Sequence, residues 1–145
     1  MASKAAKGSF VRLLVPAGKA APTPPVGPAL GARGVKSMDF CKEFNARTSH
    51  IELGVPIPTQ INVNPDRTFS FQIKTPPTAF FLKRIVGIEK GNGKHDQPIG
   101  TISLKHIYEI AKIKAMDEHA SNIPLEAIAK TIIATAKNNA VAVIP

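Results

Sequence analysis

The sequence predicts an α+β fold, in which a small three-stranded sheet with helical cover precedes a domain of three helices. Two observations lead to this prediction. Apolar residues alternate at a period of two in the first half of the chain and recur at a helical period after residue 77. Between the two halves, Pro76 and Pro77 cannot donate to a sheet ladder and hold the chain extended. We therefore expect a flexible basic tail at 1–8, domains at 9–74 and 78–145, and a hinge at 75–77.

The first domain is expected to contain three strands. Phe10–Val15 alternates and predicts the first strand, while Thr59–Val63 and Thr68–Lys74 predict a hairpin. Asn64-Pro65-Asp66-Arg67 has the composition of its turn. The hairpin then has one apolar face, made of Ile61, Val63, Phe69, Phe71 and Ile73.

Two helices are expected to cover this sheet. Residues 16–34 are dense in proline and glycine, which predicts a loop containing one short helix started by proline. Ser37 is the expected N-cap of a longer helix that runs from Met38 to about Ala46. Its buried residues would be Met38, Cys41 and Phe44.

The second half predicts three helices. The first spans Ala79–Val86 and is followed by a glycine-rich loop, Gly91–Gly100. Ser103 is expected to cap the second helix, and Asn122 or Pro124 to open the third. The apolar residues of the third helix follow i, i+3, i+4, i+7 spacing. The expected apolar positions are Leu104, Ile107, Tyr108 and Ala111 in the second helix, and Leu125, Ile128, Ala129, Ile132, Ile133 and Ala136 in the third.

Charge indicates a polyanionic partner. The chain has 19 Lys and Arg against 10 Asp and Glu, a net charge of +9. Only 6% of residues are aromatic, so an extended single-strand binder, which stacks bases on aromatic rings, fits poorly, and folded RNA fits better. Residues 1–74 carry 10 basic and 4 acidic residues, and residues 75–145 carry 9 and 6. The helical half can bind RNA only if its charges cluster.

Other function classes find little support. No apolar run reaches the roughly 20 residues that span a bilayer, and the apolar stripes of the helices are needed for a core. The single cysteine, Cys41, falls on an apolar helix face, and the four histidines lie far apart with no metal-ligand spacing. We therefore expect no catalytic residue, no metal, no cofactor, no membrane contact and no small-molecule substrate.

Two segments are candidate RNA contacts, each with a simpler alternative. The loop Lys90–Lys94 combines two glycines with two lysines, which suits phosphate contact but also an ordinary solvated loop. The helix end Thr131–Asn139 offers hydroxyl, amide and lysine groups to a shallow RNA groove, but an exposed helix face has the same composition.

Several motifs resemble one family, the large-ribosomal-subunit protein eleven family. The most specific is the proline run Ala21–Gly31, and the resemblance extends over essentially the whole chain. Further matching segments are Asp39–Ala46, Pro65–Phe69, Lys74–Pro77, Gly87-Ile88 and Glu109–Ala111 with Lys114.

The resemblance implies a structural protein whose C-terminal domain binds folded large-subunit rRNA at the GTPase-associated centre. The N-terminal domain would swing on the hinge and meet stalk proteins and translation elongation-factor GTPases. The implied rRNA-binding residues are Thr75, Pro76, Pro77, Lys83, Lys90, Gly91, Gly93, Lys94, Lys114, Asp117, Thr135, Lys137, Asn138 and Asn139. The implied residues facing the factor and antibiotic cleft are Pro22, Pro24, Pro25, Val26, Gly27, Pro28, Leu30 and Gly31. The alternative is a docking scaffold for translation GTPases with weak RNA affinity of its own.

The chain departs from the family pattern at Ala134 and Ala140, where members typically carry glycine. Glycine permits close backbone approach and a left-handed helix end, so Asn139 becomes the candidate C-cap. Ser103–Lys114 is similar to mitochondrial, especially fungal, members, and no acidic residue precedes Asp39. We expect a mitochondrial ribosome, with the bacterial cytoplasm as the alternative.

Overall fold

The computed structural model describes residues 8–91 and 97–145, and the chain divides into two compact units, Met1–Lys74 and Thr75–Pro145. The N-terminal unit contains an antiparallel sheet in the order β1 (Ser9–Pro16), β2 (Pro56–Val63), β3 (Phe69–Ile73). Its strands place the apolar residues of the hairpin on one face, as predicted, with Ile61 opposite Phe71 and Val63 opposite Phe69.

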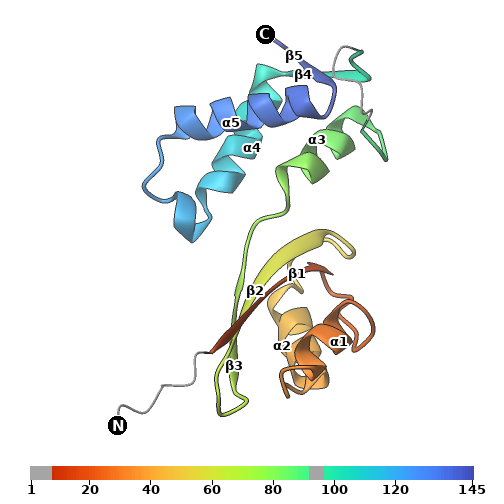
Figure 1. Cartoon of the computed structure of the whole chain (residues 1–145). Coiled ribbons are helices and arrows are strands. Elements are labelled where there is room, and N and C mark those ends of the chain that lie inside the picture. The colour runs from red at the N-terminus through yellow and green to blue at the C-terminus, as the bar shows by residue number, and fades with distance from the viewer. Residues whose placement is uncertain (1–7, 92–96) are drawn as a thin grey trace. The chain divides into compact units, whose positions relative to one another are not determined.

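Two helices, α1 (Val26–Gly31) and α2 (Ser37–Arg47), lie together on one side of this sheet (Figure 1). Phe40 and Phe44 of α2 are fully buried, and the Phe40 and Phe71 ring centroids are 5.2 Å apart. Met38 is 54% exposed, so its predicted burial is wrong. The buried stripe instead starts at Phe40, because 40, 41 and 44 share the helix face that turns toward the sheet.

The start of α2 also differs from the prediction. Lys36 occupies the N-cap position and Ser37 is the first helical residue, with no side-chain cap hydrogen bond. The β2–β3 turn is confirmed: the amide of Asn64 donates to Thr68 Oγ1 (2.9 Å), and the Asp66 carboxylate accepts from the Thr68 backbone and hydroxyl. These two bonds lower the pKa of Asp66.

The C-terminal unit contains the three predicted helices, α3 (Thr78–Val86), α4 (Leu104–Ala115) and α5 (Leu125–Asn138), and a 3₁₀ turn, η1 (Glu118–Ala120). Pro124 is the N-cap of α5, one of the two predicted starts. The core of this unit draws on every helix: Leu82, Ile107, Ile110, Ala111, Ala120, Ile128, Ile132 and Ala136 are buried in it. Leu104 and Tyr108, two of the predicted apolar positions, are exposed, because α4 buries Ile107, Ile110 and Ala111.

A two-stranded parallel sheet, which the sequence did not predict, completes this unit. β4 (Gly100–Ser103) pairs with β5 (Val141–Ile144), and Ile102 and Val141 join the helical core. Four-residue strands are too short to show a period, so the pattern gave no signal. Ser103 is the N-cap of α4, as predicted, but its Oγ lies 2.9 Å from His106 Nδ1 and makes no cap bond. No helix of the described part of the chain has the length and apolar character that crossing a bilayer requires.

Candidate nucleic-acid interface

The linker is tied to the C-terminal unit by a buried carboxylate. Asp117 Oδ1 accepts a hydrogen bond from the Thr75 backbone N–H (2.8 Å), and Oδ2 accepts one from the Thr75 hydroxyl (2.7 Å). Lys114 Nζ donates to Thr75 Oγ1 at 3.1 Å and lies 3.9 Å from Asp117 Oδ2. These three residues, which the sequence places up to 42 positions apart, form one cluster that we call the linker clasp.

Local structure explains why the clasp forms. Lys114 lies in the last turn of α4, and Asp117 stands directly before the 3₁₀ turn, so both point from the same helix end. Asp117 is 7% exposed, and a carboxylate so far from water needs hydrogen bonds and a cation, which Thr75 and Lys114 supply. The clasp thus fixes where the chain enters α3, and Pro77 then serves as the N-cap of that helix.

A small hollow of about 200 Å³ opens beside the clasp. Its polar lining comes from Lys114 and Asp117 together with the hydroxyls of Thr78 and Thr131 and the imidazole of His119. Thr78, His119 and Thr131 are not among the site residues predicted from the sequence. Thr131 could have been predicted from its spacing, because it lies four residues before the predicted site residue Thr135 and therefore on the same face of α5. A cation with hydroxyl and imidazole groups can hold a phosphate or a ribose hydroxyl.

The C-terminal end of α5 presents a second polar group. Lys137 and Asn138 are exposed, Thr135 and Asn139 are half-buried, and exposed Ala134 shares the face of Lys137 and Asn138. Asn139 occupies the C-cap position, and its side-chain amide donates to the Thr135 carbonyl at 2.8 Å. The C-cap role expected for Asn139 is therefore confirmed.

Ala140 then turns the chain from α5 into β5 with a left-handed backbone, φ 57°. This is the conformation that glycine adopts most easily. Ala140 is buried, and its carbonyl accepts a hydrogen bond from the Ile99 N–H at 2.8 Å.

Both described ends of the glycine-rich loop meet this helix end. Ile99 bonds to Ala140, and a Cβ placed on Gly91 would lie 3.6 Å from Asn139 Oδ1. The two candidate segments of the sequence, the loop and the helix end, are therefore one neighbourhood. Lys90 and Gly91 are exposed there, whereas Gly93 and Lys94 lie outside the described residues. Lys83, in the last turn of α3, is half-buried.

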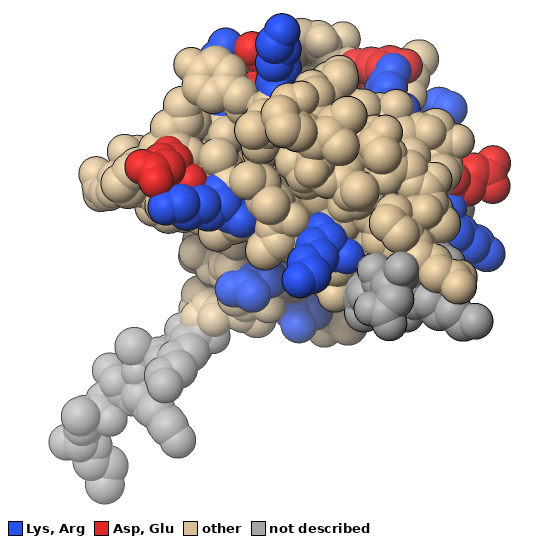
Figure 2. Space-filling model, turned by 90° about the horizontal axis from the view of Figure 1, so that it is seen from above, with Lys and Arg blue, Asp and Glu red and all other residues tan. Residues whose placement is uncertain are grey.

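Charges in this unit are dispersed. Seen from above, the surface is uncharged over a broad central area, with lysine, arginine and acidic side chains around its edges (Figure 2). Lys112 and Lys130 are paired with Glu109 and Glu126 on their own helices. Lys90 and Lys137 take part in no ion pair among residues 8–91 and 97–145. They are thus well suited to meet phosphates.

The proline-rich segment of the other unit divides into an exposed and a buried part. Pro22, Pro24, Pro25, Pro28 and Gly31 are exposed. Val26 and Leu30 differ from the expectation that they face a cleft, because their side chains are 3% and 0% exposed and anchor α1 in the core.

Gly27 allows the first turn of α1 to approach the backbone of Pro22 closely. A Cβ there would lie 2.5 Å from the Pro22 carbonyl oxygen. Only glycine therefore fits this close approach of the two backbone segments.

Comparison with known proteins agrees with this arrangement. Residues 11–69 match the N-terminal domain of ribosomal protein L11, and residues 74–143 match the RNA-binding domain of ribosomal protein L11. The chain belongs to the ribosomal protein L11 family. The RNA-binding match contains the linker clasp, the hollow and the helix end. The family is one of ribosomal structural proteins, and the expectation of a non-enzymatic chain agrees with it.

Two curated relatives refine the assignment. The large ribosomal subunit protein uL11m of Schizosaccharomyces pombe is 52% identical over 139 residues, which cover 94% of this chain and 96% of the relative. The protein of the same name from Caenorhabditis elegans is 44% identical over 134 residues, 92% of this chain and 69% of the relative. Both names are those of the mitochondrial type, so the chain is a mitochondrial-type large-subunit protein with an RNA-binding domain. The expected mitochondrial location is confirmed over the bacterial alternative.

Proposed function

We propose that the C-terminal unit binds and stabilises folded large-subunit rRNA at the GTPase-associated centre. The N-terminal unit helps to form the landing site of translation GTPases and the stalk base. The observation that carries the RNA part is the meeting of the loop ends with the α5 end, where Lys90 and Lys137 are exposed beside amide and hydroxyl groups.

The residues of the RNA face divide by role. Lys90, Lys137 and Asn138 would contact phosphate and sugar directly, with Thr135, Asn139 and Gly91 beside them. Asp117 is too buried for such contact and instead holds Thr75, while Pro76 and Pro77 stiffen the segment that follows. Lys114, Lys83 and the loop residues Gly93 and Lys94 complete the proposed set.

The proposed factor-facing part is the exposed edge of the proline-rich segment. Pro22, Pro24, Pro25 and Pro28 are exposed beside the buried anchors Val26 and Leu30, and proline rings restrict the backbone of the segment. A rigid surface loses little conformational entropy on binding, which suits a site that partners enter and leave repeatedly.

A gel-shift comparison tests the proposal. Residues 75–145 and residues 9–74 are each titrated against a folded large-subunit rRNA fragment from the GTPase-associated centre and against an unrelated fragment of equal length. We expect residues 75–145 to retain most of the affinity of the whole chain for the first fragment. Equal or tighter binding by residues 9–74 would reverse the roles of the two units. Weak binding by both, together with retention of translation GTPases, would favour a docking scaffold.

A further inference from the structure

The outer face of the three-stranded sheet is a second candidate binding surface, separate from the one above. α1 and α2 lie on the opposite side of the sheet, so the outward residues of the strands have no helical cover in their own unit (Figure 1). Strand register orders them into cross-strand rows. The first row is Phe10, Asn62 and Ser70, and the second is Arg12, Gln60 and Gln72.

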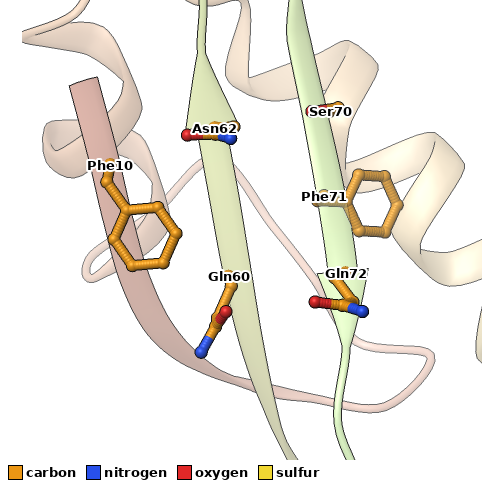
Figure 3. Close-up of a pocket in the computed structure, with 6 residues that line it drawn as sticks. All are labelled: Phe10, Gln60, Asn62, Ser70, Phe71 and Gln72. Carbon is orange, nitrogen blue, oxygen red and sulfur yellow. The ribbon is translucent and has the colours of Figure 1, made fainter. Parts of the chain in front are cut away.

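Two adjoining hollows mark this face. One, of about 260 Å³, is lined by Phe10, Asn62, Gln60, Gln72, Ser70 and Phe71, and Figure 3 shows the amide side chains of three of them spread across the strands. The other, of about 440 Å³, is lined by Arg12, Leu13, Leu14, Pro58, Thr59, Gln60 and Lys74. Gln60 lines both, so they form one continuous surface, which we call the outer sheet face.

An aromatic ring and a cation lie together at one end of the outer sheet face. Phe10 is 47% exposed although it is a large apolar side chain, and the Arg12 guanidinium lies 5.2 Å from the centroid of its ring. A nucleobase stacks on an exposed aromatic ring or on a guanidinium plane, and base–aromatic stacking is stronger than an exposed cation–π contact. A base can therefore replace Arg12 on the ring and leave the guanidinium for a phosphate.

The part of the outer sheet face around Gln60 and Asn62 is polar, whereas the part beyond Arg12 carries Leu14, which is 51% exposed, and Pro58. Gln60 lies between Arg12 and Gln72 in its row, and Asn62 lies beside Phe10. Amide side chains carry both donors and acceptors, which match the edges of unpaired bases. Protein interfaces more often have apolar or aromatic residues at their centre, with polar groups on the rim, so a protein partner fits the polar part around Gln60 and Asn62 less well.

The charges of this face have one sign. Arg12 and Lys74 line it, and the residues that line the two hollows include no Asp or Glu. The described acidic residues of this unit lie elsewhere, Asp39 and Glu43 on α2, Glu52 before β2 and Asp66 in the turn. The face is therefore complementary to a polyanion.

We propose that the outer sheet face binds one or two unpaired nucleotides of RNA, with a base stacked on Phe10, amides from Gln60 and Asn62 at its edge, and Arg12 and Lys74 at phosphates. The number of nucleotides is small because the face offers a single aromatic ring for stacking, in agreement with the low aromatic content of the chain. This binding does not depend on the function proposed for the C-terminal unit, because it involves different residues.

The test uses the full chain and a fluorescent 10-nucleotide RNA of a sequence that cannot fold, with the blunt duplex of the same sequence as a comparison. We expect Phe10→Ala to weaken binding of the unpaired RNA about fivefold or more. Phe10→Leu weakens it similarly and Phe10→Tyr preserves it, because stacking needs an aromatic ring. The duplex, whose bases are already stacked, responds little to any of these changes.

Tyr108→Ala is the matched control. Tyr108 is also half-exposed, at 50%, with Lys112 Nζ 4.5 Å from its ring centroid, but it lies on α4. Equal loss in Tyr108→Ala and Phe10→Ala, or no loss in Phe10→Ala, overturns the proposal. Binding of a poly-glutamate peptide is measured with the same variants. If the Phe10 variants bind this peptide more weakly but bind the RNA unchanged, the proposal is overturned in favour of an acidic protein partner. Urea midpoints confirm that each variant is folded.

Discussion

The Asp117 carboxylate accepts two hydrogen bonds from Thr75, one from its backbone N–H at 2.8 Å and one from its hydroxyl at 2.7 Å. The two residues are 42 positions apart in the sequence. A residue of the predicted hinge is thereby fixed to the helical unit. We infer that a pivot between the two units lies before Thr75 and not at Pro76-Pro77, because residues 75–77 all stay with the helical unit.

Loss of this carboxylate should destabilise the C-terminal unit. We expect Asp117→Ala to lower the free energy of unfolding of residues 75–145 by roughly 3 kcal/mol, because two charge-assisted hydrogen bonds are lost and Lys114 loses its counter-ion. Urea unfolding measures this. Glu126→Ala is the control: its ion pair with Lys130 is shorter, 2.6 Å, but exposed, and its loss should cost about 0.5 kcal/mol or less. Equal costs for the two variants would contradict a structural role of the clasp.

Lys137 should contribute to RNA affinity through phosphate. In Lys137→Ala, the slope of log K against log salt for the folded rRNA fragment should flatten by up to about one unit. Lys112 is also exposed, but it is paired with Glu109, and Lys112→Ala should leave the slope unchanged. Parallel titrations from low to moderate salt compare the two. An unaltered slope in Lys137→Ala would remove this lysine from the phosphate contacts.

Ala140 should tolerate no branched side chain. Its φ of 57° is unfavourable for β-branched residues and its Cβ is buried, so Ala140→Val is expected to cost about 1–3 kcal/mol of unfolding free energy. Ala142→Val, two residues later in β5, places the same side chain in a strand, where it is favoured, and should be close to neutral. Thermal unfolding compares the two variants, and similar losses would argue against a cost that is specific to the left-handed, buried position of Ala140.

Met38 and Phe40, the two apolar residues at the start of α2, should differ sharply in how much each contributes to the free energy of unfolding. Phe40→Ala removes a fully buried ring that contacts Phe71 and is expected to cost about 3–5 kcal/mol. Met38→Ala removes an exposed side chain and should change stability by about 0.5 kcal/mol or less. Urea unfolding of the full chain, followed by a signal from the sheet, measures both. A larger stability loss in Met38→Ala than in Phe40→Ala would indicate that α2 buries the face predicted from the sequence spacing.

Much of the fold was predictable from local pattern. The hairpin β2–β3, the turn at Asn64–Arg67 and helix α5 follow from alternation, turn chemistry and helical spacing, which neighbouring residues determine. The helix faces were less predictable. Met38 and Phe40 are both apolar, and only the position of α2 against the sheet decides which one is buried.

The candidate RNA site divides in the same way. Lys137, Asn138 and Asn139 were recognisable as a polar helix end, because they are consecutive. The hollow residues Thr78, His119 and Thr131 were not, because they come from separate elements.

The sequence by itself determined the two-domain order, the proline linker and the resemblance that identifies the family, since each depends on contiguous residues. The tertiary structure alone decided that Asp117 holds Thr75, that β4 and β5 pair, and that Gly91 lies beside Asn139. Each of these joins residues tens of positions apart. Such contacts form only when packing of the shared core offsets the entropy lost in closing the intervening chain. This balance depends on residues far apart in the sequence, so it cannot be predicted from a local pattern.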